Sequence, residues 1–501
     1  MDLVITEDRK FLKITKCTER EYDQMVLSLT KKIDGWRFNP LVKRGLWNGE
    51  ISFIKKGYIP SGLWHEVQDI GKNFNFEAKV SNLDVLFDKE FSPEDFTMWV
   101  EEFFQDAEKK PRDYQIDTAI KILKYKTCLA ELATSAGKTM IIFMVLGYLL
   151  HKEKVVKILM IVPNVSLVMQ STEDFDTYNN EKLNLRIQQV YGGSKIKLKT
   201  NLVIGTFQSL AKLEQEYFDQ FQVVVTDETH RATSASIRKI LDKCWHCTYR
   251  FGVSGTIPKS GTIDRLNIMS NTGPLITSVN ASDLIDKGHI TPCRVSIIQM
   301  SYAEEDQREA FYSLSKTSED RKSLFALEQK FIVNNKKRLD FITKFISKVT
   351  KNSMVLFHRI EYGEAIYNIL RNLVDNEVYY VSGVTGKDDR EDYKKTMEDG
   401  EGKILVASFG TFSTGVSINN IHNIFLVESF KSDVIIRQSI GRGLRKHDDK
   451  EVLNIVDFVD DIRYEDEYGK RWNNYLYKHA IRRQEIYKEQ NFPYVIKKVS
   501  F

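Results

Sequence analysis

The sequence predicts two doubly wound α/β domains with parallel sheets, preceded by a small α+β domain and followed by a helical tail. From Pro111 onward, short apolar runs bounded by polar or glycine residues alternate with helical patterns. Such runs are typical of buried parallel strands joined by helices. The same alternation returns after Ser353, whereas the first hundred residues lack it. Together these observations indicate two domains of one class and a different N-terminal domain.

Composition limits the number of domains and the classes of protein to which the chain can belong. The chain has 501 residues, 42% of them hydrophobic and 28% charged, which suits about three globular domains. A formal charge of +4 is too small to indicate a polyanion partner, so such a prediction must rest on local clustering. No apolar run reaches the roughly eighteen residues of a membrane span, so we expect no membrane partner. An odd number of cysteines and no signal peptide predict a reducing, cytoplasmic setting: Cys17, Cys128, Cys244, Cys247 and Cys293.

Residues 1–105 are predicted to form the N-terminal domain. The segment from Lys31 to Pro60 interleaves five aromatic residues with cations, and its glycines mark turns, so it predicts a hairpin-rich sheet with a basic face. Cations that replace counterions, together with rings that stack on bases, suit nucleic acid. The alternative is an ordinary module with core aromatics and solvated lysines. The seven cations are Lys31, Lys32, Arg37, Lys43, Arg44, Lys55 and Lys56.

Residues 106–290 are predicted to form the first α/β domain. Its helical patterns lie at 113–125, 140–150, 166–178 and 281–287. Ligands of such a domain bind at the carboxyl ends of its strands. The predicted strands are Thr127–Leu132, Ile158–Val162, Leu202–Thr206, Gln222–Thr226 and Arg250–Ser254.

A phosphate-binding loop is predicted between the first of these strands and the helix after it. Small residues let backbone N–H groups surround phosphate, the helix N-terminus adds positive potential, and a lysine and a hydroxyl serve phosphate and Mg²⁺. The full pattern would place glycine where this chain has Leu132, so the alternative is a chance GKT before a core helix. The candidate ligands are Ser135, Ala136, Gly137, Lys138 and Thr139.

Further candidates lie on either side of this loop. Asp227 and Glu228 end a buried strand, so Asp227 suits Mg²⁺ and Glu228 suits activation of water. Upstream, the amide of Gln115 suits the adenine edge, and Arg112 or Tyr114 suits the ring face. Downstream, Cys244 and Cys247 form one C-x-x-C, for which a buried turn is favoured over half a zinc site or a redox pair. The Ser-Gly-Thr at 254–256 ends another strand and is suited to relay the nucleotide state to a strand-binding surface, although alone it is simply a turn.

Residues 291–460 are predicted to form the second α/β domain, with strands at 354–357, 378–381, 404–407, 424–427 and 453–456 and helices at 361–373 and 388–397. A helix carrying Gln438, Arg442 and Arg445 would place both guanidiniums on one face, suited to a γ-phosphate. The alternative is a helix that pairs with its neighbours. Residues 461–501 are predicted to be a helical tail.

The ordered motifs of residues 112–447 resemble those of superfamily 2 helicases. The matching segments are ATSAGKT (133–139), IVPNVSLVMQ (161–170), GTFQSL (205–210), DETH (227–230), SGT (254–256), VLFH (355–358), STGVS (413–417) and QSIGRGLR (438–445). The resemblance implies two RecA-like domains with ATP and Mg²⁺ as cofactors. It implies adenine contact at Gln115, catalysis at Glu228, and γ-phosphate sensing at Gln438, Arg442 and Arg445. It also implies strand contacts at Pro163, Thr206 and Thr414.

More narrowly, GWRFNP and GLWNG within residues 35–49, together with QSIGRGLRKH, resemble the UvsW-type recombination and repair helicases of tailed phages. This resemblance implies remodelling of forks, Holliday junctions and R-loops, with single-stranded, duplex and branched DNA or RNA–DNA hybrids as partners, in the host cytoplasm. The rival interpretations are the motor subunit of a restriction nuclease, a duplex translocase that does not separate strands, and a binding module with an inactive ATPase. Substrate preference and oligomeric state stay open.

Overall fold

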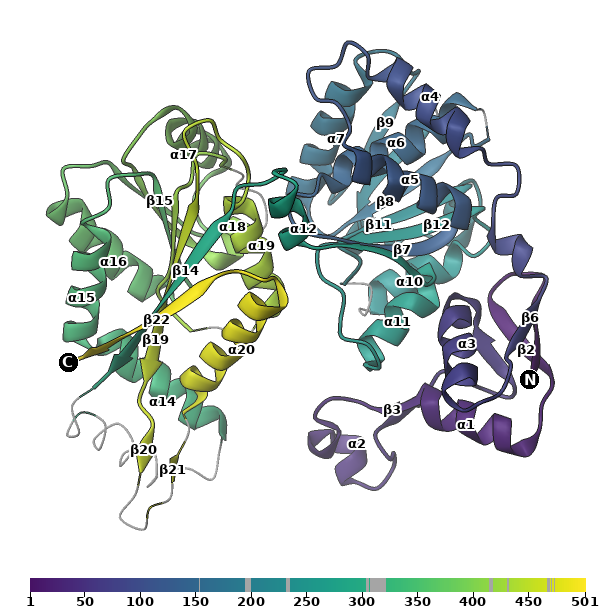
Figure 1. Ribbon diagram of the computed structural model, residues 1–501, viewed down its shortest axis with the longest axis horizontal. Coiled ribbons are helices and arrows are strands. Elements are labelled where there is room, and N and C mark those ends of the chain that lie inside the picture. Colours follow the sequence, from purple (N-terminus) through teal and green to yellow (C-terminus); the bar gives the residue numbers. More distant parts are fainter. Residues whose placement is uncertain are drawn as a thin grey trace. The chain divides into compact units, whose positions relative to one another are not determined.

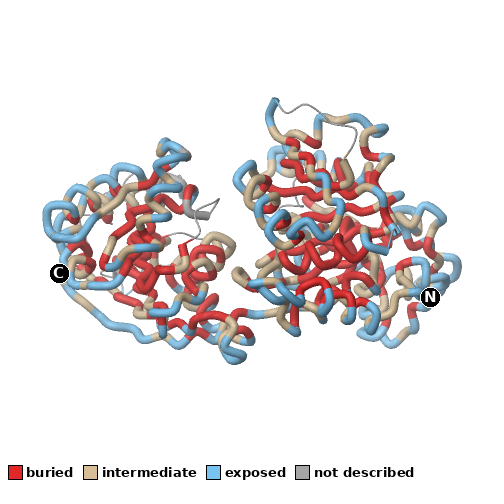
Figure 2. The backbone as a smooth tube through the Cα atoms, turned by 90° about the horizontal axis from the view of Figure 1, so that it is seen from above, coloured by how far each residue is buried: buried red, intermediate tan, exposed pale blue. Residues whose placement is uncertain are grey.

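The computed structural model describes residues 1–152, 154–193, 200–230, 235–302, 306, 321–413, 418–429, 432–465, 469, 471–472 and 474–501. These residues form two compact units, Met1–Val279 and Asn280–Phe501 (Figure 1). In each unit the buried residues concentrate on central strands and the helices against them (Figure 2). In the described ranges, no helix is long and apolar enough to cross a bilayer.

The N-terminal part of the first unit is built on a four-stranded mixed sheet of order β5-β2-β1-β6. Helix α1 begins at a capping box, in which the Thr18 hydroxyl accepts from the Glu21 N–H and the Glu21 carboxylate accepts from the Thr18 N–H. The elements are β1 (Asp2–Ile5), β2 (Phe11–Lys16), α1 (Glu19–Leu29), β5 (Tyr58–Pro60), η2 (Ser61–Leu63), α3 (Trp64–Asn73), β6 (Lys79–Ser81) and η3 (Leu83–Leu86). The next helix, α4 (Pro93–Phe103), packs on the α/β part of the unit, where the ring centroids of Trp99 and Tyr148 lie 5.5 Å apart.

An arm of residues 30–52 extends from this sheet (Figure 1). Its stem is the antiparallel pair β3 (Thr30–Lys32) and β4 (Glu50–Ser52), and its far end holds η1 (Trp36–Phe38) and α2 (Pro40–Lys43). The predicted hairpin is therefore present only as a stem, because the end of the arm is helical. Asn39 and Pro40 explain the difference, since the Asn39 side chain accepts from the Leu41 N–H and proline suits the first helical position.

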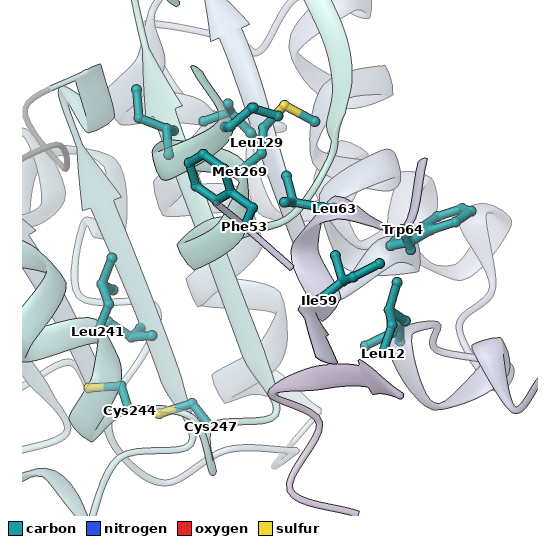
Figure 3. Packing of buried hydrophobic residues seen from close by; sticks show 14 of the residues in the cluster. Leu12, Phe53, Ile59, Leu63, Trp64, Leu129, Leu241, Cys244, Cys247 and Met269 are labelled. Atoms are coloured by element: carbon teal, nitrogen blue, oxygen red, sulfur yellow. The ribbon is translucent and has the colours of Figure 1, made fainter. Parts of the chain in front are cut away.

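The N-terminal part shares a hydrophobic core with the α/β part of the same unit. Leu63 lies in one cluster with Leu129 and Met269, whose strand and helix belong to the α/β part (Figure 3). The hydroxyl of Tyr249 also donates to the Asp88 carboxylate at 2.7 Å. Removing the N-terminal part would therefore expose apolar surface on the α/β part.

The α/β part of the first unit has a seven-stranded parallel sheet of order β13-β7-β12-β11-β8-β10-β9. Helices α5, α6 and α7 cover one face, and α10 and α11 cover the other (Figure 1). The elements are α5 (Asp113–Tyr125), β7 (Thr127–Leu132), α6 (Lys138–His151), β8 (Ile158–Val162), α7 (Val165–Asn179), β9 (Ile187–Val190), β10 (Leu202–Thr206), α8 (Phe207–Leu210), α9 (Gln215–Phe218), β11 (Val223–Asp227), α10 (Ala235–Lys243), β12 (Tyr249–Ser254), α11 (Ile263–Thr272) and β13 (Leu275–Val279).

The second unit has another seven-stranded parallel sheet, of order β16-β17-β15-β18-β19-β14-β22. Its elements are α12 (Ala281–Asp286), β14 (Cys293–Ser301), α14 (Arg321–Asn334), α15 (Lys336–Ile346), β15 (Ser353–Phe357), α16 (Ile360–Leu373), β16 (Val378–Val381), α17 (Lys387–Asp399), β17 (Ile404–Ser408), α18 (Phe409–Ser413), β18 (Asn423–Leu426), α19 (Asp433–Gly443), β19 (Leu453–Asp461), the short pair β20 (Tyr464–Glu465) and β21 (Arg471–Trp472), α20 (Tyr475–Glu489) and β22 (Tyr494–Ser500).

The predicted fold class is confirmed, and each strand predicted in the two α/β domains is present. Four strands of these sheets were not predicted: β9, β13, β14 and β22. Three of them lie at sheet edges, where a strand does not need a continuous apolar run. Strand β22, with Lys497 and Lys498, also shows that the predicted helical tail is only partly helical, because its last segment pairs with β14.

A buried charge network joins the helices of the second unit to its sheet. Arg338 on α15 donates to both carboxylate oxygens of Asp460 on β19, at 2.7 and 3.0 Å, and to the Val427 carbonyl at 2.8 Å. It also donates to the hydroxyl of Tyr362. Neither Arg338 nor Asp460 reaches solvent through its side chain. Breaking such a pair is costly because it leaves one charge buried and uncompensated.

We expect Arg338→Leu to destabilise the second unit by roughly 3–5 kcal/mol, because the Asp460 carboxylate would remain buried without its partner. Hydrogen exchange of β19 peptides measures this loss. The matched control is Lys351→Ala, which removes an ion pair to Glu401 whose side chains are 48% and 71% exposed. Equal β19 protection in both variants would show that the buried pair is not needed for stability.

Candidate nucleotide-binding site

The loop between β7 and α6 is shaped by backbone geometry. Ser135 and Gly137 both have φ of 74°, and the Ala136 N–H closes the turn on the Ala133 carbonyl at 2.9 Å. A Cβ at position 137 would lie 2.3 Å from Nε2 of Gln115, so the position requires glycine. Because α6 begins at Lys138, its first backbone N–H groups lack carbonyl partners within the helix, as an anion site needs.

Two side chains of α5 support this loop from behind. Nε2 of Gln115 and the hydroxyl of Tyr114 donate to the Ala136 carbonyl at 2.9 and 2.8 Å, and Oε1 of Gln115 accepts from the Arg112 N–H at 2.9 Å. Tyr114 is buried, and its burial raises the pKa of its hydroxyl. Of the two side chains predicted for a ring face, Tyr114 is thus committed to the loop, and the adenine contact of Gln115 stays a prediction.

The strand order brings the predicted catalytic groups to one edge of the first sheet. Strand β12 lies between β7 and β11, and all three are parallel, so their carboxyl ends meet. Nζ of Lys138 lies 3.5 Å from Oε1 of Glu228, and Nδ1 of His230 lies 3.2 Å from Oε2. Glu228 has φ of 51°, uncommon for a residue with a side chain, and such strain gathers at functional sites.

The two neighbouring carboxylates differ in charge environment. Burial and the adjacent Glu228 charge raise the pKa of Asp227 to about 6. Burial would also raise the pKa of Glu228, but Lys138 and His230 outweigh it and hold that pKa well below its usual range. Asp227 is therefore the carboxylate that a further cation would stabilise most. Its oxygens and the Thr139 hydroxyl are the hard ligands that Mg²⁺ prefers.

Contacts around this edge link the strands. Nδ1 of His230 lies 3.0 Å from Oγ of Ser254, whose hydroxyl donates to the Thr256 carbonyl at 2.9 Å. Glu131 was not predicted to take part. Its carboxylate accepts from the Ile257 N–H at 3.2 Å and from the Ser278 hydroxyl at 2.9 Å, which holds the loop after β12. The sequence signal for this role was a single acidic residue inside an otherwise mostly apolar strand.

The predicted strand contacts of the first unit lie at another part of the same edge. Pro163 follows β8 and Thr206 ends β10, its neighbour. Both are buried, and the Thr206 hydroxyl donates to Oγ of Ser209 at 3.1 Å. Thr414 lies outside the described residues. Five of the seven predicted N-terminal cations lie on the arm, and Lys55 and Lys56 follow it. All seven are exposed except the half-buried Lys31.

In the second unit, Gln438 and Arg442 lie on α19, and Gln438 is buried. The prediction that Arg442 and Arg445 share a helix face is wrong, because α19 ends at Gly443 and Leu444 caps it. Arg445 follows the helix, where its carbonyl accepts from the Thr291 hydroxyl at 3.2 Å. The two glycines of the segment, Gly441 and Gly443, made this end hard to place from sequence.

The C-x-x-C segment forms a buried turn after α10, as favoured. The Cys247 N–H donates to the Cys244 carbonyl at 3.1 Å, and both side chains are buried. Among the described residues, no three His, Cys, Asp or Glu side chains group as they would to hold a metal ion.

Two parallel sheets, with a phosphate loop and an acidic pair at one edge of the first, are typical of superfamily 2 helicases. The family model described as "Type III restriction enzyme, res subunit" matches residues 108–259. The ATP-dependent DNA helicase uvsW of Enterobacteria phage T4 is 31% identical over 500 residues, 97% of each chain. The DNA 3′-5′ translocase XPB2 of Sulfurisphaera tokodaii is 23% identical over 68% of this chain and 80% of its own.

Among solved structures, the type ISP restriction-modification enzyme LlaBIII bound to DNA is 15% identical, with a TM-score of 0.57 over 86% of this chain and 34% of its own. At that identity the likeness concerns the fold alone. The end-to-end match is decisive for the family: the chain belongs to the ATP-dependent DNA helicases of the uvsW type.

We expect Lys138→Ala to lower ATP turnover by roughly a hundredfold or more, because it removes the positive charge at the phosphate loop. Steady-state hydrolysis with saturating DNA measures this. The matched control, Lys152→Ala, removes the same charge just beyond the other end of α6. DNA affinity without nucleotide should be unchanged in both. Near-normal turnover in Lys138→Ala would remove this loop from the site.

Proposed function

We propose that this chain uses ATP to unwind and remodel branched DNA, including forks, Holliday junctions and R-loops, in recombination, repair and replication. One observation supports this most: Lys138, Asp227 and Glu228 converge at one edge of the first sheet, in a chain that matches a DNA helicase over 97% of both lengths. The three side chains provide a means of ATP hydrolysis, and the match to a DNA helicase indicates DNA as the substrate.

Each group at this edge has a task in the proposed reaction. Lys138 and the loop N–H groups hold the phosphates, with Gln115 and Tyr114 fixing the loop behind them. Asp227 and Thr139 would hold Mg²⁺, which neutralises charge on the phosphates. Glu228 would position and deprotonate the attacking water once the phosphates draw Lys138 away, because the neighbouring charges that lower its pKa also weaken it as a base.

The second unit contributes groups that respond to the γ-phosphate. We assign this role to Gln438, Arg442 and Arg445, since a guanidinium stabilises the charge that develops as the phosphoryl group leaves. Closure on ATP and opening after hydrolysis would then alternate the grip on a strand. We assign strand contacts to Pro163, Thr206 and Thr414, and duplex or hybrid contacts to the cations of the arm.

A restriction motor is the second candidate, supported by the match of residues 108–259 to the restriction-enzyme model. That match covers only part of the first unit. The uvsW relative covers both units and the N-terminal part, so it weighs more. A duplex translocase that does not separate strands would share the same ATP site, and the strand-separation readout below distinguishes it.

We expect ATP-dependent strand separation to be fastest on forks, junctions and R-loops and slower on linear duplexes of equal length. Rates of hydrolysis and strand separation, measured on this panel with one protein preparation, test the proposal. Hydrolysis and movement without separated strands would indicate a duplex translocase. Cut products would indicate a nuclease motor.

We expect Arg442→Ala to slow ATP turnover by roughly a thousandfold or more, with a much smaller change in ATP affinity. The control is Arg437→Ala on the same helix, whose guanidinium pairs with Glu489. Single-turnover hydrolysis and nucleotide titration separate the two quantities. A changed nucleotide Kd with normal turnover would assign Arg442 to binding instead.

A further inference from the structure

The arm of residues 30–52 carries apolar side chains that nothing in the described structure covers. Its stem is the β3–β4 pair, and its far end, which we call the tip, is residues 36–46. Phe38 is 69% exposed, Leu41 is 48% exposed and Leu46 is 72% exposed. Residues 33–48 include no buried residue. Large apolar side chains gathered at one exposed place usually mark an interaction surface.

Local bonds hold the tip in shape although it has no core. The Leu46 N–H donates to the Leu41 carbonyl at 2.9 Å, and the indole N–H of Trp47 donates to the Glu50 carbonyl at 3.0 Å. Gly49 has φ of 80°, and a Cβ there would lie 2.7 Å from Cβ of Trp36. The chain therefore fixes these apolar groups outward instead of burying them, which favours a binding role.

Cations surround the apolar groups. Nζ of Lys32 lies 4.1 Å from the ring centroid of Trp36, and the guanidinium of Arg37 lies 5.3 Å from it. Lys43 and Arg44, both exposed, fall between the apolar residues of α2 and Leu46. The arm as a whole has five cations against two carboxylates. Such a surface complements a polyanion that also offers apolar faces, which describes nucleic acid with accessible bases.

A continuous duplex does not offer such faces, because each base pair is covered by its neighbours. Base faces become accessible where the stack is interrupted, at a helix end or a branch point. We propose that the tip binds the interrupted base stack of branched DNA, with Phe38, Leu41 and Leu46 against the exposed pair and Lys43 and Arg44 at the flanking phosphates. This inference rests on the proposed function and names the feature of branched DNA that is recognised.

The test compares two DNAs without ATP: a three-way fork with closed ends and a linear duplex with closed ends. Phe38→Ser combined with Leu46→Ser should lower fork affinity by about tenfold, since stacking contacts of this kind carry that order of energy. Affinity for the closed duplex should stay unchanged. A 2-aminopurine at the fork's first pair should brighten with the native protein and not with this variant.

Two controls sharpen the comparison. Met98→Ser removes an apolar side chain that is 68% exposed on α4, away from the arm, and should change neither affinity. Lys43→Glu with Arg44→Glu should weaken fork binding and lower its salt slope, by about 0.9 for each phosphate that the variant no longer neutralises. Together these variants separate apolar recognition from general charge attraction.

Several results would overturn the inference. Retained fork preference in the serine variant would do so, as would an equal loss on both DNAs. A loss confined to binding of anionic vesicles, or to self-association in sedimentation, would assign the tip to a membrane surface or a second copy. The proposed function is judged separately, by ATP-driven remodelling of forks. If the native protein remodels forks while the serine variant keeps its preference, only the tip inference fails.

Discussion

The parallel pairing of β7, β12 and β11 is the constraint on which the catalytic edge depends. About ninety residues separate Lys138 from Glu228, yet the strands that precede them lie on either side of β12. Parallel strands end at one edge, so the loop after β7 and the acidic pair after β11 face the same space. The buried apolar runs of these strands therefore serve the site as well as the core.

The charges at that edge are arranged unequally. Lys138 and His230 both lie against Glu228, while Asp227 is a half-buried carboxylate whose pKa is raised. In the proposed reaction the phosphates would compete with Glu228 for Lys138, which would release the carboxylate for water. A divalent cation would at the same time satisfy Asp227. Nucleotide binding would then reorganise an existing charge cluster.

The N-terminal part combines two modes of construction. Its sheet packs on the α/β part through Leu63 and Met269, so the two behave as one body around a common core. The tip of the arm has no such packing and depends on local hydrogen bonds, caps and glycine geometry. A segment built this way can present apolar and cationic groups outward from a rigid body, which suits contact with an extended ligand.

The sequence alone determined the class of both α/β domains, their predicted strands and the GKT and Asp-Glu groups. Apolar periodicity and motif spacing are local properties, and burial imposes them directly. Tertiary structure decided the rest. The strands β9 and β22 lack a continuous apolar run because each lies at a sheet edge and has a neighbouring strand on one side only. Arg445 lies outside α19 because the helix ends at Gly443 and Leu444 caps it. Tyr114 and Glu131 gained their roles from partners distant in the chain, and no local pattern encodes such contacts.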